Sequence, residues 1–379
     1  MSPEDLGWHS AAFPELRAGP PWVMDEMVKA QVGLAEALAG APGAAEIAAA
    51  VLQTARDGAP IVVTGCGTSE HGALAVAELI GQALRDLGSA ARVESRQALD
   101  AALDARAGGV CIGVSHEGTT RATILALEAA RATGAVIAGI SVRPESPLAA
   151  GADHALITPL VDRSWCHTVA YTSTILAGTA IADGMTGRAS DTRGSIPSAL
   201  VLRGQIEELA ARIHGASRIL TVGLGADLIT ARELALKIEE GARTPTTALH
   251  LETLLHGHLA GCDAGATALV LFAADPRPGA RRDWRLRCAA GAAGAIGIPA
   301  ITIGGGAALS NLPDAVGRLV LPPAGAGTEL PHALLTGAVC LQLLTLALAE
   351  LAGVNPDLIR REQRPYREAA AVAGNRTDW

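Results

Sequence analysis

Few aromatic side chains occur in this 379-residue chain, although it is rich in apolar ones. Aromatic residues make up 2% of a composition that is 49% hydrophobic. Small aliphatic side chains favour helices packed closely on sheets over a membrane-spanning protein. The longest apolar run, at 333–354, is long enough to cross a bilayer but includes Gln342 and Glu350. We therefore expect a core helix of a soluble protein and no membrane partner.

Paired cysteines, basic runs and a secretory leader are also missing. The six cysteines are widely spaced without a CxxC pair, which is typical of reduced thiols in the cytoplasm. Residues 1–5 (MSPED) do not begin a basic segment followed by an apolar one, so no signal peptide is expected. With a formal net charge of −8 and no run of Lys or Arg, nucleic acid is not an expected partner. The predicted location is the cytoplasm.

Lysine is nearly absent. It occurs only at Lys29 and Lys237, and the other 28 of the 30 basic Lys and Arg residues are arginine. Lysine can lose its proton and act as a base, nucleophile or point-charge donor, whereas arginine stays protonated. Lys237, within a predicted helix, is therefore a candidate functional residue, although two lysines left by chance remain an alternative.

Two similar halves follow one another along the chain. The strand, turn and helix at 61–84 recur 158 residues later, so that Gly223 corresponds to Gly65. The strand at 110–114 recurs at 268–272 with the same offset. Strands that alternate with helices predict two tandem doubly wound α/β domains, each with a parallel sheet and helices on both faces. The predicted parts are an amino-terminal arm with helices (1–50), a first domain (51–193), a second domain (194–353) and a tail (354–379).

Hydroxyl-rich loops follow two predicted strands of the first half. Thr68 and Ser69 follow the first strand, and the segment from Ser115 to Thr120 follows the strand at 110–114. In parallel sheets, ligands bind at the carboxyl ends of the strands, where helix amino termini favour an anion. Simple turn and N-cap roles for these hydroxyls remain an alternative. The second half has Gly and Ala at most of the equivalent positions, so one anion site, in the first domain, is expected.

Charged residues of the second half form another candidate site. The spacing of Glu233, Lys237 and Glu240 places all three on one face of a helix, which is either solvated or catalytic. His256, next to Gly257, is a candidate proton-transfer group or an ordinary turn residue.

Motifs for metals, dinucleotides and hydrolysis are missing or incomplete. Neither GxG after a strand, at 65–67 or 223–225, completes GxGxxG, and no GxSxG turn is present. The spacing of the histidines and the glutamate near residue 256 matches no standard zinc motif; these are His250, Glu252, His256 and His258. We expect neither a metal nor another cofactor.

Several segments resemble motifs of SIS (sugar isomerase) domain proteins. The turn at 66–69 (CGTS) matches the family's CGTS turn, and the loop at 115–120 (SHEGTT) resembles its SQSGET loop. The helix at 235–240 (ALKIEE) resembles ALKLKE, and 255–257 (LHG) resembles the KHGP turn. With a fitting amino-terminal helix at 24–31, nearly the whole chain resembles the isomerase half of glutamine:fructose-6-phosphate amidotransferase and its glutaminase-free relatives, the amino-sugar-phosphate deaminases and deglycases.

The resemblance implies a role for each matching residue. Glu240 would move a proton between carbons 1 and 2, Lys237 would steady the enediol oxygen, and His256 from the neighbouring subunit would help to open the ring. It thus implies a homodimer with shared sites. The sugar phosphate would be held by Ser69, Ser115 and Thr120, with Thr68 and Gly118 beside them. The other expected substrate-binding residues are Cys66, Gly67, His116, Glu117, Thr119 and Arg364.

Three departures from the family pattern affect this prediction. Residue 2 is Ser and no glutaminase domain is expected before the first unit, so ammonia from glutamine is not the expected donor. His116 and Glu117 replace Gln and Ser, and an acid beside a phosphate is unfavourable unless it points away or meets Arg121 or a substrate amine. The family's Schiff-base lysine falls on Arg364, which cannot form an imine.

The predicted protein is a phosphosugar aldose-ketose isomerase or an amino-sugar or fructosamine phosphate deaminase (deglycase). One alternative is a non-catalytic phosphosugar-binding regulator, which the loss of the tail lysine favours and the Glu/Lys/His set opposes. A dinucleotide-dependent oxidoreductase is a weaker alternative.

Overall fold

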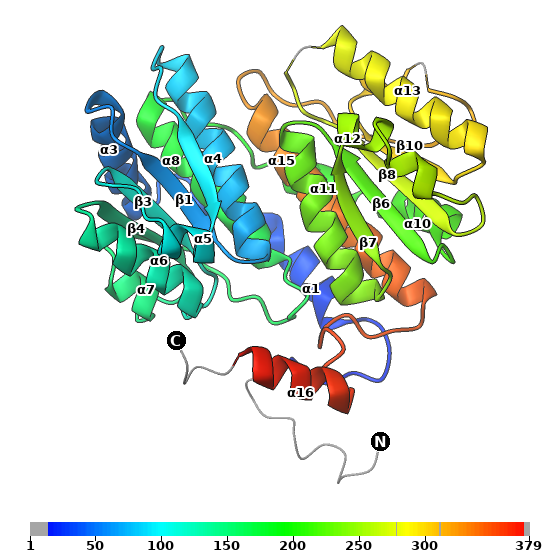
Figure 1. Cartoon of the computed structure of the whole chain (residues 1–379), viewed down its shortest axis with the longest axis horizontal. Coiled ribbons are helices and arrows are strands. Elements are labelled where there is room, and N and C mark those ends of the chain that lie inside the picture. The colour runs from blue at the N-terminus through cyan, green and yellow to red at the C-terminus, as the bar shows by residue number, and fades with distance from the viewer. Residues whose placement is uncertain (1–13, 278, 311, 375–379) are drawn as a thin grey trace.

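The computed structural model describes residues 14–277, 279–310 and 312–374 and consists of two α/β lobes side by side (Figure 1). Each lobe contains a five-stranded parallel sheet with helices on both faces. The predicted class, two doubly wound parallel-sheet units in tandem, is confirmed. Residues 1–13 of the predicted arm and 375–379 of the predicted tail lie outside the described residues.

The first lobe has the strand order β2-β1-β3-β4-β5. Its strands are β1 (Ile61–Gly65), β2 (Val93–Gln97), β3 (Val110–Val114), β4 (Val136–Ser141) and β5 (His154–Ile157). Its helices are α3 (Pro42–Arg56), α4 (Thr68–Asp86), α5 (Ala98–Leu103), α6 (Arg121–Ala132), α7 (Pro147–Ala150) and α8 (Val169–Thr186). The central strands β1 and β3 are apolar runs buried along their whole length, as strands covered on both faces require. Because β1 and β3 pair in parallel, the turns that follow them lie at the same edge.

The second lobe repeats this topology with the order β10-β9-β8-β6-β7. Its strands are β6 (Arg218–Gly223), β7 (Thr246–His250), β8 (Thr267–Ala273), β9 (Ala300–Gly304) and β10 (Gly317–Val320). Its helices are α9 (Ser195–Leu200), α10 (Arg203–Ile213), α11 (Ala226–Lys237), α12 (Leu251–Leu255), α13 (Ala280–Ile296), α14 (Gly306–Leu309) and α15 (Glu329–Leu351). The sequence did not predict β7, a mostly half-buried edge strand without an apolar run.

The amino-terminal helical segment at 23–38 is interrupted. It divides into α1 (Val23–Ala30), a 3₁₀ turn at Gln31–Gly33 and α2 (Leu34–Leu38). The buried Gln31 amide donates to the Val28 carbonyl and to Gln342 of α15, which ties the turn to the second lobe. Asp357, after α15, accepts the first backbone N–H groups of α1 at 2.9 and 2.7 Å. The amino- and carboxyl-terminal segments are thus joined below the lobes (Figure 1).

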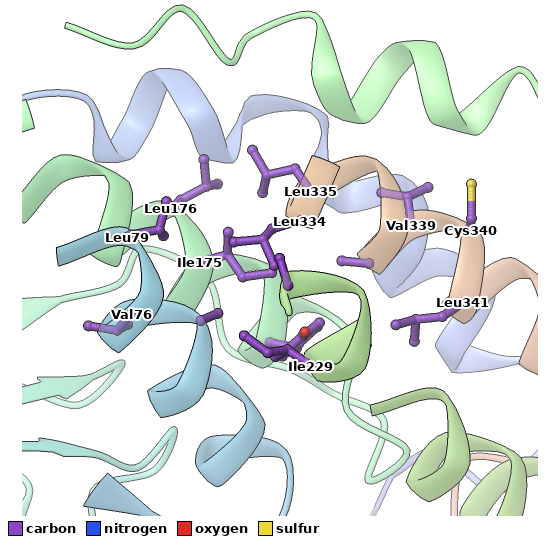
Figure 2. Close-up of a cluster of buried hydrophobic side chains, with 14 of the residues drawn as sticks. Val76, Leu79, Ile175, Leu176, Ile229, Leu334, Leu335, Val339, Cys340 and Leu341 are labelled. Carbon is purple, nitrogen blue, oxygen red and sulfur yellow. The ribbon is translucent and has the colours of Figure 1, made fainter. Parts of the chain in front are cut away.

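Four helices join the two lobes: α4 and α8 from the first, α11 and α15 from the second. Figure 2 shows their shared apolar cluster, which includes Val76 of α4, Ile175 of α8, Ile229 of α11 and Leu334 of α15. Among the described residues, α15 alone is by itself long and apolar enough to cross a membrane, and 89% of its apolar window is buried inside the fold. This burial fits the expected core helix.

Candidate active site

The loop after β3 gathers hydroxyls at the amino terminus of α6. Ser115 is buried, and its Oγ lies 3.0 Å from Oγ1 of Thr120. Thr120 is the N-cap of α6, but its side chain makes no cap hydrogen bond in the described structure. Gly118 has a φ of 67°, and a Cβ there would lie 2.1 Å from Ser146 Oγ, so only glycine fits this turn. The two hydroxyls are paired beside a helix terminus that favours an anion.

The turn after β1 lies next to this loop. A Cβ on Gly65 would lie 2.5 Å from the Ser69 carbonyl oxygen, so the chain folds back closely into α4. Exposed Gly67, with φ 57°, is the N-cap, and Thr68 and Ser69 form the first turn of α4. Cys66 Sγ lies 3.9 Å from Oγ1 of Thr123 in α6, and burial raises the pKa of this thiol. The two predicted phosphate-binding segments are therefore adjacent.

Two residues that depart from the family loop have partners within the first lobe. His116 Nε2 accepts the backbone N–H of Asp162 at 2.9 Å, and burial lowers the pKa of His116 to about 4, so the ring is neutral. The Glu117 carboxylate accepts a hydrogen bond from Arg143 Nε at 3.0 Å. Arg143, rather than Arg121, therefore neutralises the acid beside the predicted anion site. Thr119 is exposed in the same loop.

The helix α11 carries a buried charge cluster. Lys237 is fully buried and forms ion pairs with Glu240 Oε2 and, at 3.7 Å, with Glu233 Oε1. Burial acts to lower the pKa of Lys237, but the charges of Glu240 and Glu233 outweigh it and raise this pKa above its ordinary value. The ammonium is therefore held protonated.

Glu240 lies in a π-helical turn, Ile238–Ala242, that continues α11. Such turns displace side chains from the regular helical positions and are frequent at functional sites. Burial raises the pKa of Glu240, against the opposing effect of Lys237. Its side chain is 23% exposed, whereas that of Lys237 is not exposed at all. Glu240 is thus the more accessible partner of this pair.

A residue that the sequence did not indicate connects the two halves. His71 of α4 lies 2.7 Å through Nδ1 from Oε2 of the fully buried Glu233 in α11. His71 is two residues beyond Ser69, and Glu233 is one helical turn before Lys237. This contact fixes α4, which begins at the predicted phosphate-binding turn, against the charge cluster of the second lobe. The available signal was the position of His71 just after the CGTS turn.

Two predicted residues lie elsewhere in the single chain. His256 follows α12, has 74% of its side chain exposed, and lies 3.3 Å from Glu252. Arg364 begins the separate helix α16 (Arg364–Ala373), where its Nε donates to Glu368 at 2.6 Å. The described contacts bring neither residue to Lys237 or Glu240 within this chain.

The segment before α16 brings another basic residue toward Glu240. The Arg361 guanidinium lies 4.4 Å from the Trp165 ring centroid. Burial lowers the pKa of Arg361, while the charge of Glu240 raises it, so the two are within electrostatic reach. Nothing in the sequence pattern distinguished Arg361 from the other arginines.

The second lobe fills its equivalent anion position with its own carboxylate. Asp275, after β8, accepts the Ala226 N–H at the start of α11 at 2.9 Å and is held by Arg277. Asp227 accepts the N–H groups of residues 274 and 275, and burial raises the pKa of Asp227 to about 7. Among the described residues, a carboxylate therefore stands in the second lobe where the first lobe presents Ser115 and Thr120. No cluster of three or more metal-ligating side chains occurs in the described parts of the chain.

Comparison with known proteins identifies the class of the first lobe. The family model of the SIS domain matches residues 56–184, so this part of the chain is a SIS domain. The chain is 29% identical over 315 residues to a glutamine–fructose-6-phosphate aminotransferase (isomerizing) of Pyrococcus horikoshii, covering 78% of this chain and 50% of that protein. It is 26% identical over 231 residues to human glutamine–fructose-6-phosphate aminotransferase (isomerizing) 2, covering 57% of this chain and 34% of that protein. The chain thus spans half or less of the length of these relatives.

Solved structures extend the similarity of fold to both lobes. The carboxyl-terminal domain of glucosamine-fructose-6-phosphate aminotransferase from Francisella tularensis has a TM-score of 0.72 at 18% identity, covering 89% of this chain and 98% of that one. Tagatose-6-phosphate ketose/aldose isomerase from Escherichia coli has a TM-score of 0.71 at 18% identity, and the match covers 92% of this chain and 97% of that one.

Proposed function

We propose that this protein is a phosphosugar aldose-ketose isomerase, or a deaminase or deglycase acting on an amino-sugar or fructosamine phosphate. One observation carries the proposal: the His71–Glu233 contact joins the helix after the phosphate turn to the helix that bears Lys237 and Glu240. Two half-sites from different lobes are thereby held against each other. The match of residues 56–184 to the SIS domain supports the choice of substrate class.

In this proposal the first lobe anchors the phosphoryl group. The hydroxyls of Ser69, Ser115 and Thr120 and the N–H groups at the starts of α4 and α6 would donate to its oxygens. Arg143 keeps Glu117 from opposing the bound charge. The carbonyl end of the sugar then lies toward α11.

The second lobe would perform the proton transfer. Glu240, with a raised pKa and a partly open side chain, suits a base that moves a proton between carbons 1 and 2. Lys237, held protonated, suits stabilisation of the enediolate oxygen. Glu233 and His71 act by holding Lys237 in place. A second candidate, a non-catalytic phosphosugar sensor, is favoured by the solvent-exposed Arg364 at the family's imine-forming position.

We further propose two SIS domains in tandem, at 51–193 and 194–353, and a cytoplasmic homodimer. A residue that enters the site of a neighbouring subunit must be exposed in the single chain, and His256 is exposed. In the dimer it would approach the sugar ring oxygen of the other chain.

A substrate panel tests this function. Hexose, hexosamine and fructosamine 6-phosphates are incubated with the protein, and both ammonia release and ketose formation are followed. Turnover of at least one member, lost in Glu240→Gln, supports an enzyme. Binding without turnover of any member supports the sensor.

A further inference from the structure

A cavity of about 650 Å³ lies between the two lobes and contains none of the predicted site residues. Its wall is formed by one face of α4, the segment leading into β2 and the first half of α11. The lining residues from α4, from α11 and from the N-cap of α11 include Ala77, Gly81, Leu228 and Gly225, which are small or apolar and leave room for a ligand. The volume lies in the range of roughly 300–1,000 Å³ that is typical of small-molecule sites.

Three arginines from both lobes line this cavity: Arg85 and Arg92 from the first and Arg232 from the second. Glu78 is the one carboxylate among the described lining residues, and its Oε1 is already approached at 3.1 Å by both Arg85 and Arg277. Arg92 and Arg232 are exposed, and neither forms a hydrogen bond or ion pair within the described residues. The cavity therefore has an excess of unneutralised guanidinium charge.

This arrangement selects the chemistry of an occupant. Guanidinium groups bind phosphate through two parallel N–H donors, and arginines contributed by two different lobes favour a ligand with charge at two points. We infer that the cavity binds a small phosphate-bearing molecule with at least two negative charges, held between Arg92 and Arg232. Arg232 directly precedes Glu233, so an occupant would tie the two lobes together next to the His71–Glu233 contact.

Calorimetric titration of the whole 379-residue chain with inorganic pyrophosphate tests this inference. The wild type is expected to bind, and Arg92→Gln with Arg232→Gln is expected to weaken binding at least tenfold. The matched control, Arg281→Gln with Arg287→Gln on α13, changes the net charge equally and should alter the affinity less than twofold. Gly81→Leu fills the cavity without changing charge; a Cβ at Gly81 would meet only Arg85 Nη1, at 3.4 Å, so this variant should fold and bind weakly.

Ser115→Ala separates this cavity from the proposed substrate site. It should leave pyrophosphate binding at the arginine cavity intact, whatever reaction the protein catalyses. No binding to the wild type, equal losses in the two double variants, or loss only in Ser115→Ala would overturn the inference. Absence of turnover in the substrate panel would overturn the proposed enzyme activity but not the inference that the arginine cavity binds a phosphate-bearing molecule.

Discussion

Replacing Lys237 by methionine tests the buried charge cluster. Methionine matches the length of the lysine stem but removes the ammonium that lies between Glu233 and Glu240. Removal of one partner from a buried ion pair typically costs about 3–5 kcal/mol, because the remaining charge has lost its compensation. We expect a loss of that size in the free energy of unfolding at pH 8.

The loss should become smaller at lower pH. Without the ammonium, the folded-state pKa of Glu240 rises further above its unfolded value. A carboxyl group with a raised folded pKa stabilises the protein below that pKa and loses this stabilisation as the pH rises through it. Lys237→Met should therefore be less destabilising at pH 5.5 than at pH 8.

The chain's other lysine provides the control. Lys29 is 62% exposed and pairs with Asp25 one helical turn away, so Lys29→Met should cost less than about 1 kcal/mol. Adding Glu233→Gln to Lys237→Met removes a buried carboxylate that has lost its lysine partner and keeps only His71, so this change should recover part of the loss. Urea titrations at the two pH values measure all four proteins. Equal stability of the two methionine variants, or no pH dependence of the difference, would refute the reasoning.

Three further predictions concern the loops and buried titratable groups. Ser115→Ala should weaken phosphosugar binding about 10- to 100-fold by calorimetry, because a hydrogen bond to a charged group contributes roughly 1.5–3 kcal/mol, and unchanged affinity would remove Ser115 from the phosphate site. Burial lowers the pKa values of His116 and His167 to about 4. Both rings bind protons more readily in the unfolded chain, so the free energy of unfolding should fall as the pH falls from about 6.5 toward 4, by up to roughly 3 kcal/mol per ring. In the double variant His116→Gln/His167→Gln, the midpoint urea concentration of unfolding should change less with pH over that range. Burial raises the pKa of Asp227 to about 7, so the stabilisation of the fold by the protonated carboxyl is lost as the pH rises toward that value. Asp227→Asn should therefore become more stable relative to the wild type as the pH rises from 5 to 8. Urea titrations of both proteins at the two pH values measure this difference, and an unchanged difference would contradict the prediction.

The fold followed largely from two periodic features of the sequence. The apolar runs at 61–64 and 110–114 and their repetition 158 residues later predicted paired parallel sheets, because buried parallel strands need continuous apolar residues. The edge strand β7 was missed for the converse reason: most of its residues are only half-buried, and three of the five (Thr246, Thr247 and His250) are polar. The break near Gln31 depends on a contact with Gln342, 311 residues away, which no local pattern reveals.

The adjacency of two predicted loops could be expected from the sequence, because both follow strands of one parallel sheet. The resemblance to SIS proteins singled out Ser69, Ser115 and Thr120 in these loops, and the pairing of β1 with β3 brings the two turns together. His71 and Arg361 were not indicated, because their importance arises from contacts between segments far apart in sequence. The rarity of lysine did single out Lys237, which the fold buries completely.

The central claim is that one lobe anchors a phosphosugar while Glu240 of the other moves its proton. Glu240→Gln tests it most directly, with glucosamine 6-phosphate and fructose 6-phosphate followed by binding calorimetry and by deuterium uptake from heavy water at carbons 1 and 2. We predict unchanged affinity and deuterium uptake at least 100-fold slower than in the wild type. Uptake at the wild-type rate in Glu240→Gln would contradict the account.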